Sequence, residues 1–158
     1  MSALQPKQHL REMIQSARHR LVNDLKAIPA EKQNERPGGC ARSALHIVAE
    51  CATLNGTIAT FLRTGTMNRL SREEREAHLR SFDTEETALA YLEQETQRLL
   101  EAVDTLDENT LGDVSTEPLG RPMSRFALAG LPAGHMMYHD GQLNYIQTLH
   151  GDDKIHWS

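Results

Sequence analysis

The chain has 158 residues, the length of one domain, and a chain of this size can bury a substantial core. Its formal net charge of −5 at pH 7 argues against nucleic acid as the main partner. Apolar residues make up 39% of the chain and charged residues 25%, a balance typical of globular rather than disordered proteins. We therefore expect one globular domain over residues 1–158.

Two further classes of protein are disfavoured. No apolar run approaches the ~18 residues of a membrane-spanning helix, and the first residues lack the apolar core of a signal peptide. The two cysteines, Cys40 and Cys51, are too few for a disulfide framework, and we expect both to be small buried groups rather than ligands. The sequence therefore predicts a cytoplasmic protein that does not bind membranes.

The first half of the chain shows apolar residues at steps of three and four, the pattern of amphipathic helices. A first helix is predicted over Gln5–Ile28, ended by Pro29. A second is predicted from Ala41 or Ser43 to Arg63. Because this second helix is apolar almost all round, we expect it to be the most buried.

The middle of the chain begins with a charged connection, Thr66–Asp83. Within it, the Ser-x-x-Glu at 71–74 has the form of a capping box, which predicts a short surface helix. A third long helix follows. Asp83 and Glu86 resemble its cap, and a stripe of leucines and other apolar residues continues to Leu106.

A polar connection over 107–121 leads to the last helix, and connections of this length are often functional. Proline is tolerated in the first turn of a helix but kinks a helix interior. We therefore expect the last helix to begin at about Pro132, after a short segment or kink at Arg125–Ala129, and to end near His150. Four long helices without a convincing strand predict an all-α four-helix bundle, with a short extra helix in the 66–83 connection.

The last predicted helix carries two histidines four residues apart. On a helix, His135 and His139 lie on one face, with Cβ atoms about 5–6 Å apart, so both rings can bind one transition-metal ion. They share this face with Gln142, Ile146 and Leu149, so we expect them to face the bundle interior. Buried imidazoles need partners, and a carboxylate or a backbone carbonyl is the alternative to a metal.

His46, on the buried second helix, is the candidate third ligand, because bundles build metal sites from side chains on facing helices. Three neutral imidazoles would leave a position for water or substrate, as in catalytic sites. Glu50, one turn later, is a candidate fourth ligand, hydrogen-bond acceptor for a ligand, or general base. The alternative for His46 is a core histidine bonded to the backbone.

Two stretches together resemble the DinB/YfiT-like superfamily: RSALHIVAE at 42–50, and the H-x-x-x-H-x-G-Q string at 135–142. The resemblance extends over essentially the whole chain in helix order and length. It implies a four-helix bundle with a three-histidine metal site, whose ligands here would be His46, His135 and His139.

One residue departs from that pattern. Many members carry Arg where Asp140 stands, so the local charge is reversed and the substrates of Arg-bearing relatives do not carry over. Asp140 lies about 100° round the helix from His139, which is compatible with an exposed position. The single tryptophan, Trp157, is expected to anchor the C-terminal tail against the bundle or a second subunit.

The resemblance implies a divalent-metal enzyme that activates a thiol or water, either a thiol S-transferase or a metal-dependent hydrolase. Zn²⁺ and Ni²⁺ both suit imidazole ligands, and a low-molecular-weight thiol would be a further cofactor. Glu50 would be the base, Gln142 would bond a ligand or orient a histidine, and the partners would be a small-molecule substrate and a second copy in a homodimer. The alternative is a non-catalytic stress-response or binding bundle with a structural metal or none.

Overall fold

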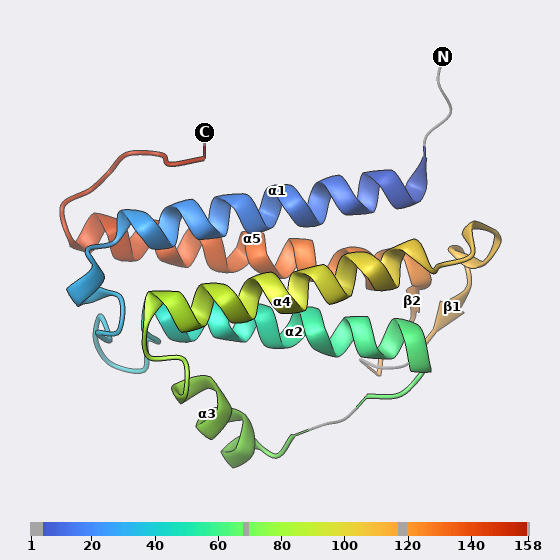
Figure 1. Cartoon of the computed structure of the whole chain (residues 1–158), viewed down its shortest axis with the longest axis horizontal. Helices are drawn as coiled ribbons and strands as arrows, with labels where there is room; N and C mark the ends of the chain where they lie inside the picture. The colour runs from blue at the N-terminus through green and yellow to red at the C-terminus, as the bar shows by residue number, and fades with distance from the viewer. Residues whose placement is uncertain (1–4, 68–69, 117–119, 158) are drawn as a thin grey trace.

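The computed structural model describes residues 5–67, 70–116 and 120–157. Four long helices form a bundle over these residues, which confirms the predicted all-α fold (Figure 1). These helices are α1 (Pro6–Ala27), α2 (Ala44–Thr64), α4 (Glu85–Asp104) and α5 (Arg125–Leu149).

The bundle consists of two close helix pairs, α1 with α5 and α2 with α4, joined mainly where α5 meets α2. The apolar stripes predicted from the sequence form the core, and Leu10, Ile14 and Leu21 of α1 are fully buried. Because burial of this apolar surface drives folding, the stripes fix which face of each helix points inward. Only the remaining faces are open to solvent.

The helix α2 lies deepest in the bundle, as predicted. By length and composition alone, α2 is also long and apolar enough to cross a membrane. Its most apolar stretch is 67% buried inside the bundle, as in the core helix of a globular domain. The Ser43 hydroxyl accepts from the His46 N–H at the start of α2, and Gly65 ends it with a φ of 71°, a value that favours glycine.

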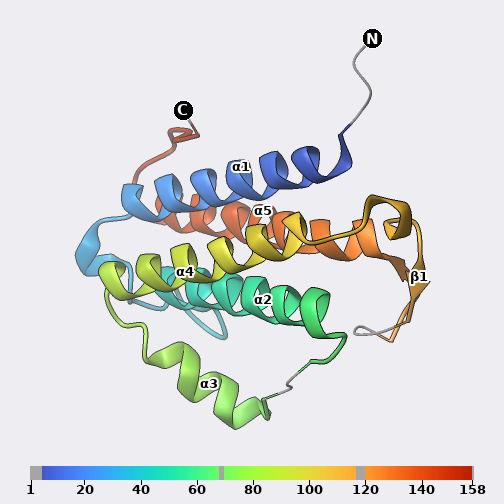
Figure 2. The ribbon, with the colours of Figure 1, turned by 45° about the vertical axis from the view of Figure 1, so that its right-hand side comes forward.

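The short surface helix is confirmed as α3 (Arg72–Arg80), with the predicted capping box between Ser71 and Glu74. Figures 1 and 2 show α3 outside the bundle, beside α2 and α4. Its side chains are mostly exposed, and Leu79 is the buried residue that packs it onto the domain.

The predicted cap of the third long helix was wrong by one residue. Because α4 begins at Glu85, the N-cap position falls on Thr84 and not on Asp83. The Thr84 hydroxyl accepts from the Thr87 N–H at 3.2 Å, and the Thr87 hydroxyl accepts from the Thr84 N–H in return. A hydroxyl pair thus satisfies the backbone groups that the carboxylates were expected to satisfy.

The predicted start of the last helix was also wrong. The helix α5 runs unbroken from Arg125, and Pro132 lies buried inside it. Ser124 caps the first turn by accepting from the Ala127 N–H at 3.1 Å. Proline removes one helical hydrogen bond, but packing of the buried residues on either side holds the helix through this position.

Short irregular elements occupy the connections. A two-stranded antiparallel ladder joins β1 (Val114–Ser115) to β2 (Met123–Ser124), with Val114 opposite Ser124. Single 3₁₀ turns lie at Ala30–Lys32 and Glu108–Thr110. These strands are not predictable from the sequence, because two residues are too few for an alternating pattern to show.

The C-terminal tail is anchored on the bundle, one of the two positions expected for it. The Trp157 indole N–H donates to the Asp24 carboxylate of α1 at 3.1 Å. The Arg20 guanidinium lies 4.7 Å from the centre of the Trp157 ring, in a cation–π contact. Both contacts hold the tail against α1.

Asp140 is buried and not exposed, because α5 packs α1 on the side away from its histidines. Only 3% of Asp140 is exposed, and it lies beside Asp24 at the base of the tail. Burial and the Asp24 carboxylate raise the pKa of Asp140 to about 8. Asn144 donates to the same Asp24 carboxylate at 2.5 Å. The residue that departs from the resembled sequence pattern is therefore part of an internal α1–α5 contact.

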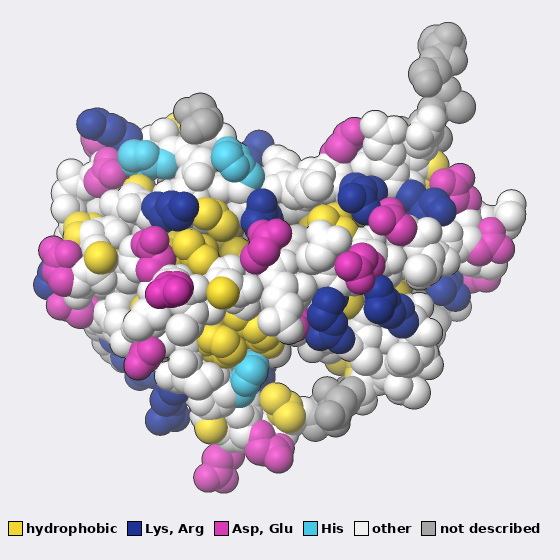
Figure 3. All heavy atoms as spheres, viewed as in Figure 1, with side chains coloured by type: hydrophobic (Ala, Val, Ile, Leu, Met, Phe, Trp, Pro, Cys, Tyr) yellow, Lys and Arg dark blue, Asp and Glu magenta, His cyan; other side chains and the backbone are white. Residues whose placement is uncertain are grey.

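The surface carries both charge signs. On the face shown in Figure 3, acidic and basic side chains are interspersed over the helices, with no stripe of one sign.

Two glycine substitutions should change the free energy of unfolding in opposite directions, because Gly56 lies where α2 approaches α4 closely and Gly141 faces open space. A methyl group at Gly56 would overlap the carboxylate of Glu95, which is buried and bound to Arg98 at 2.6 Å. Gly56→Ala should therefore lower the free energy of unfolding by about 1–3 kcal/mol. Gly141→Ala meets nothing within 4 Å and should raise it by about 0.5–1 kcal/mol. Chemical denaturation measures both; shifts of the same sign would contradict the packing.

Candidate metal centre

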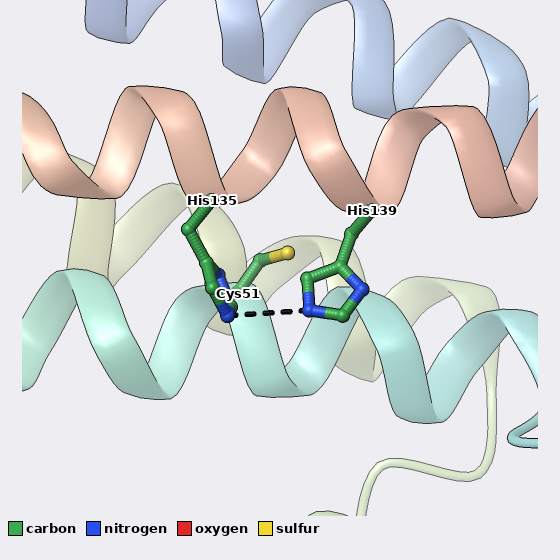
Figure 4. Close-up of side chains that lie close together, drawn as sticks. All are labelled: Cys51, His135 and His139. Carbon is green, nitrogen blue, oxygen red and sulfur yellow. Dashed lines mark hydrogen bonds between the residues drawn. The ribbon is translucent and has the colours of Figure 1, made fainter.

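The two histidines of α5 project toward α2, one turn apart (Figure 4). Their Nε2 atoms are 3.2 Å apart and their ring centres 4.4 Å apart. Two nitrogens that bind one zinc ion tetrahedrally, each at about 2.0–2.1 Å, lie roughly 3.3 Å from each other. The separation between His135 and His139 therefore fits two ligands of a single ion.

Gln142 orients one of these rings. Its Oε1 lies 2.7 Å from Nδ1 of His139. Because an amide oxygen only accepts, Nδ1 carries the proton, and Nε2 keeps its lone pair directed toward His135. Metal-ligating histidines are commonly oriented in this way by an acceptor on the other ring nitrogen. Of the two roles expected for Gln142, its position fits that of orienting a histidine.

The third group beside the pair is Cys51 of α2. Its sulfur and one nitrogen of each histidine all lie within 4.8 Å of one another, and they form the one such cluster in the described part of the chain. Cys51 is fully buried, and burial raises the pKa of its thiol. We expected only a small buried group here. The signal that could have found it is its place on the core face of α2, one turn after the buried Ile47.

His46 lies near this cluster but not within it. It is buried in the first turn of α2, five residues and about 7.5 Å of helix rise before Cys51. Burial lowers the pKa of His46, and the nearby Glu76 carboxylate opposes that change. The structure thus brings together His135 and His139 of the predicted ligands, and places Cys51 closer to them than His46.

Glu50, the predicted base, is turned toward Arg42. The two side chains form an ion pair, and the carboxylate of Glu50 is mostly buried. Among the described residues, neither imidazole of α5 has a hydrogen bond to it. The structure therefore pairs Glu50 with the arginine and not with the histidines of α5.

Both imidazoles of α5 are neutral at pH 7. Burial, the neighbouring His139 and the positive charge of Arg42 lower the pKa of His135 to about 4. Burial likewise lowers the pKa of His139, against the opposing hydrogen bond from Gln142. In the described residues, Nδ1 of His135 is buried without a hydrogen-bond partner. Neutral imidazoles are the form that binds metal ions.

Comparison with known proteins decides the family. Residues 13–143 match the sequence profile of the DinB superfamily, which is most of the chain. The chain belongs to the DinB superfamily. This superfamily is metal-associated, in agreement with the His/Cys cluster of this DinB protein.

Two solved structures share the DinB fold. One is a conserved protein from Enterococcus faecalis, with a TM-score of 0.75 and 16% identity, covering 93% of this chain and 98% of that one. The other is a DinB-like protein from Bacillus subtilis, with a TM-score of 0.68 and 17% identity, covering 93% and 94%. No curated protein sequence is significantly similar to this DinB chain. At these identities the likeness establishes the fold.

The depressed histidine pKa predicts how the metal-free protein responds to acid. His135 titrates near 6.5 when unfolded and at about 4 when folded, so the unfolded chain binds the proton first. Stability is therefore fully present above pH 6.5 and falls as the pH drops toward 4, by roughly 3 kcal/mol at about 1.4 kcal/mol per pH unit. His139 acts in the same direction.

Denaturant unfolding with a chelator between pH 7 and 4.5 measures this loss. His135→Gln should flatten the decline, whereas His9→Gln, at an exposed position, should leave it unchanged. An equal slope in the wild type and in His135→Gln would show that this imidazole is not buried in the neutral form.

Proposed function

We propose that this DinB protein is a divalent-metal-dependent enzyme that activates a thiol or a water molecule, as a thiol S-transferase or a metal-dependent hydrolase. The observation that carries the proposal is the convergence of the two Nε2 atoms of His135 and His139 at 3.2 Å. Burial keeps both rings neutral, and Gln142 holds one lone pair in the right direction. Its substrate would be a small molecule, and its compartment the cytoplasm.

The remaining ligand comes from α2, and two residues there are candidates. His46 is the one implied by the family resemblance, and Cys51 is the one supported by proximity. Imidazole and thiolate together suit zinc, while nickel also accepts imidazole. With His135 and His139, either residue makes three protein ligands, which leaves a position for substrate as in catalytic zinc sites.

The side chains around the pair have distinct proposed roles. A divalent ion held there would supply Lewis acidity, which lowers the pKa of a thiol or water. Gln142 keeps the proton of His139 on Nδ1, away from the site. Glu50 is the proposed general base, and its carboxylate is held in an ion pair with Arg42. A low-molecular-weight thiol would be the second reactant of a transferase.

Cys51 also favours a second candidate function. If His46 and Cys51 both bound the ion, four protein ligands would close its coordination sphere, as in structural zinc sites. The protein would then be a non-catalytic binding or stress-response bundle. The number of ligands therefore separates the two functions.

Metal content tests the proposal. Protein purified without an affinity tag or chelator should carry about one equivalent of zinc or nickel per chain by mass spectrometry, and His135→Ala/His139→Ala should lose it. If the site is open, only one of the two single variants, His46→Ala or Cys51→Ala, should lose the metal. No bound metal even after incubation with Zn²⁺ and Ni²⁺ would overturn the proposal.

The same variants separate enzyme from structural bundle. Loss of metal in both single variants would indicate a closed four-ligand site and the non-catalytic function. If one position stays open, the metal-loaded protein should add a thiol to an electrophilic probe, or hydrolyse an activated ester, faster than the His135→Ala/His139→Ala variant. Circular dichroism serves as the control that each variant keeps its helices.

A further inference from the structure

A cavity of about 890 Å³ opens between α3, the first turn of α2 and the connection that precedes α2. Its basic lining is the feature that stands out. Arg36 and Arg42 come from the α2 side, and Arg72 and Arg80 come from α3. His46 forms part of the same wall. We call this space the arginine cavity.

The lining of the arginine cavity has a net positive charge, opposite in sign to the net charge of the whole chain. Four arginines face two glutamates, Glu73 and Glu76, in its lining, whereas the whole chain has a net charge of −5. A concave surface that concentrates one sign of charge focuses its field on ligands of the opposite sign. The cavity is therefore a local electropositive site on an acidic protein.

In the part of the chain that the structure describes, two of the four guanidinium groups are available to bind a ligand. Arg42 is paired with Glu50, and Arg80 lies 4.0 Å from Glu76. In the described part of the chain, Arg36 and Arg72 have no ion pair. A guanidinium offers a planar fork of N–H donors that matches the two oxygens of a carboxylate or a phosphate. The two groups come from different segments, Arg36 from the connection before α2 and Arg72 from the start of α3, and both line the same cavity.

The arginine cavity adjoins the metal centre through two residues. Arg42 lines the cavity, and its charge also acts on Cys51, His135 and His139. His46 lines both this cavity and a neighbouring one of about 540 Å³, which Arg36 and Arg80 share. A molecule bound in the arginine cavity would therefore lie beside the proposed reaction site.

We propose that the arginine cavity binds an oxyanion group, a carboxylate or a phosphate, of a small molecule, with Arg36 and Arg72 as its principal donors. That this group belongs to the substrate or to its thiol partner rests on the proposed function; the binding of the anion does not. Because both arginines are exposed, the affinity falls as salt concentration rises.

Binding of two probes to the full chain tests this proposal. Inorganic phosphate and citrate are titrated separately and followed by calorimetry at low salt, in a buffer without other polyvalent anions. At least one probe should bind, and Arg36→Gln and Arg72→Gln should each weaken it by about three- to tenfold. Binding of phosphate alone identifies a phosphate ligand, and binding of citrate alone identifies a carboxylate.

A matched control removes the same charge elsewhere. Arg63 lies near the other end of α2, where it pairs with Glu101 outside the cavity, so Arg63→Gln should leave the affinity unchanged. No binding of either probe at millimolar concentration, or an equal loss in Arg63→Gln, would overturn the proposal. All three arginines are exposed, and circular dichroism confirms that the variants fold.

A further variant separates this proposal from the proposed function. His135→Ala/His139→Ala should still bind the anion, because the arginine cavity is built without these residues. Anion binding without metal binding would leave the cavity assignment intact and remove the enzyme proposal. Metal binding without anion binding would remove the cavity assignment and leave the enzyme proposal intact.

Discussion

The site depends on one constraint, the enclosure of two imidazole rings side by side on the inner face of α5. Buried polar nitrogens are costly unless they have partners, and Nδ1 of His135 has none among the described residues. The same burial lowers the pKa of both rings and leaves lone pairs where protons would otherwise sit. A metal ion held by the two Nε2 atoms would supply the positive charge that burial denies to the rings, whereas Nδ1 of His135 would still need an acceptor of its own.

The bundle keeps these rings in register by giving α5 two buried faces. One face turns the histidines toward α2, and the other turns Asp140 toward Asp24 of α1, where Trp157 of the tail also binds. Because α5 is one unbroken helix through Pro132, the contacts on one face constrain the orientation of the other. The packing of α1 and the docking of the tail thus support the metal centre from outside it.

The sequence predicted what depends on spacing along one helix: the core stripes, the capping box at Ser71, and the His135–His139 pair. It could not predict what depends on packing between helices. Cys51 belongs to no sequence motif, and only the approach of α2 to α5 places it beside His135 and His139. The burial of Asp140 depends on the α1–α5 contact, which spacing along α5 does not reveal. The helix continues through Pro132 because of packing around it, whereas local preference alone places proline in the first turn.

X-ray absorption at the zinc edge, on metal-free protein loaded with one equivalent of Zn²⁺, tests the central claim most directly. We predict nitrogen neighbours at about 2.0–2.1 Å with the multiple scattering of two imidazole rings, joined by a sulfur at about 2.3 Å if Cys51 is the ligand from α2. Both imidazole signals should vanish in His135→Ala/His139→Ala. A shell of oxygen neighbours alone, identical in the wild type and that variant, would contradict the claim that this pair holds the metal.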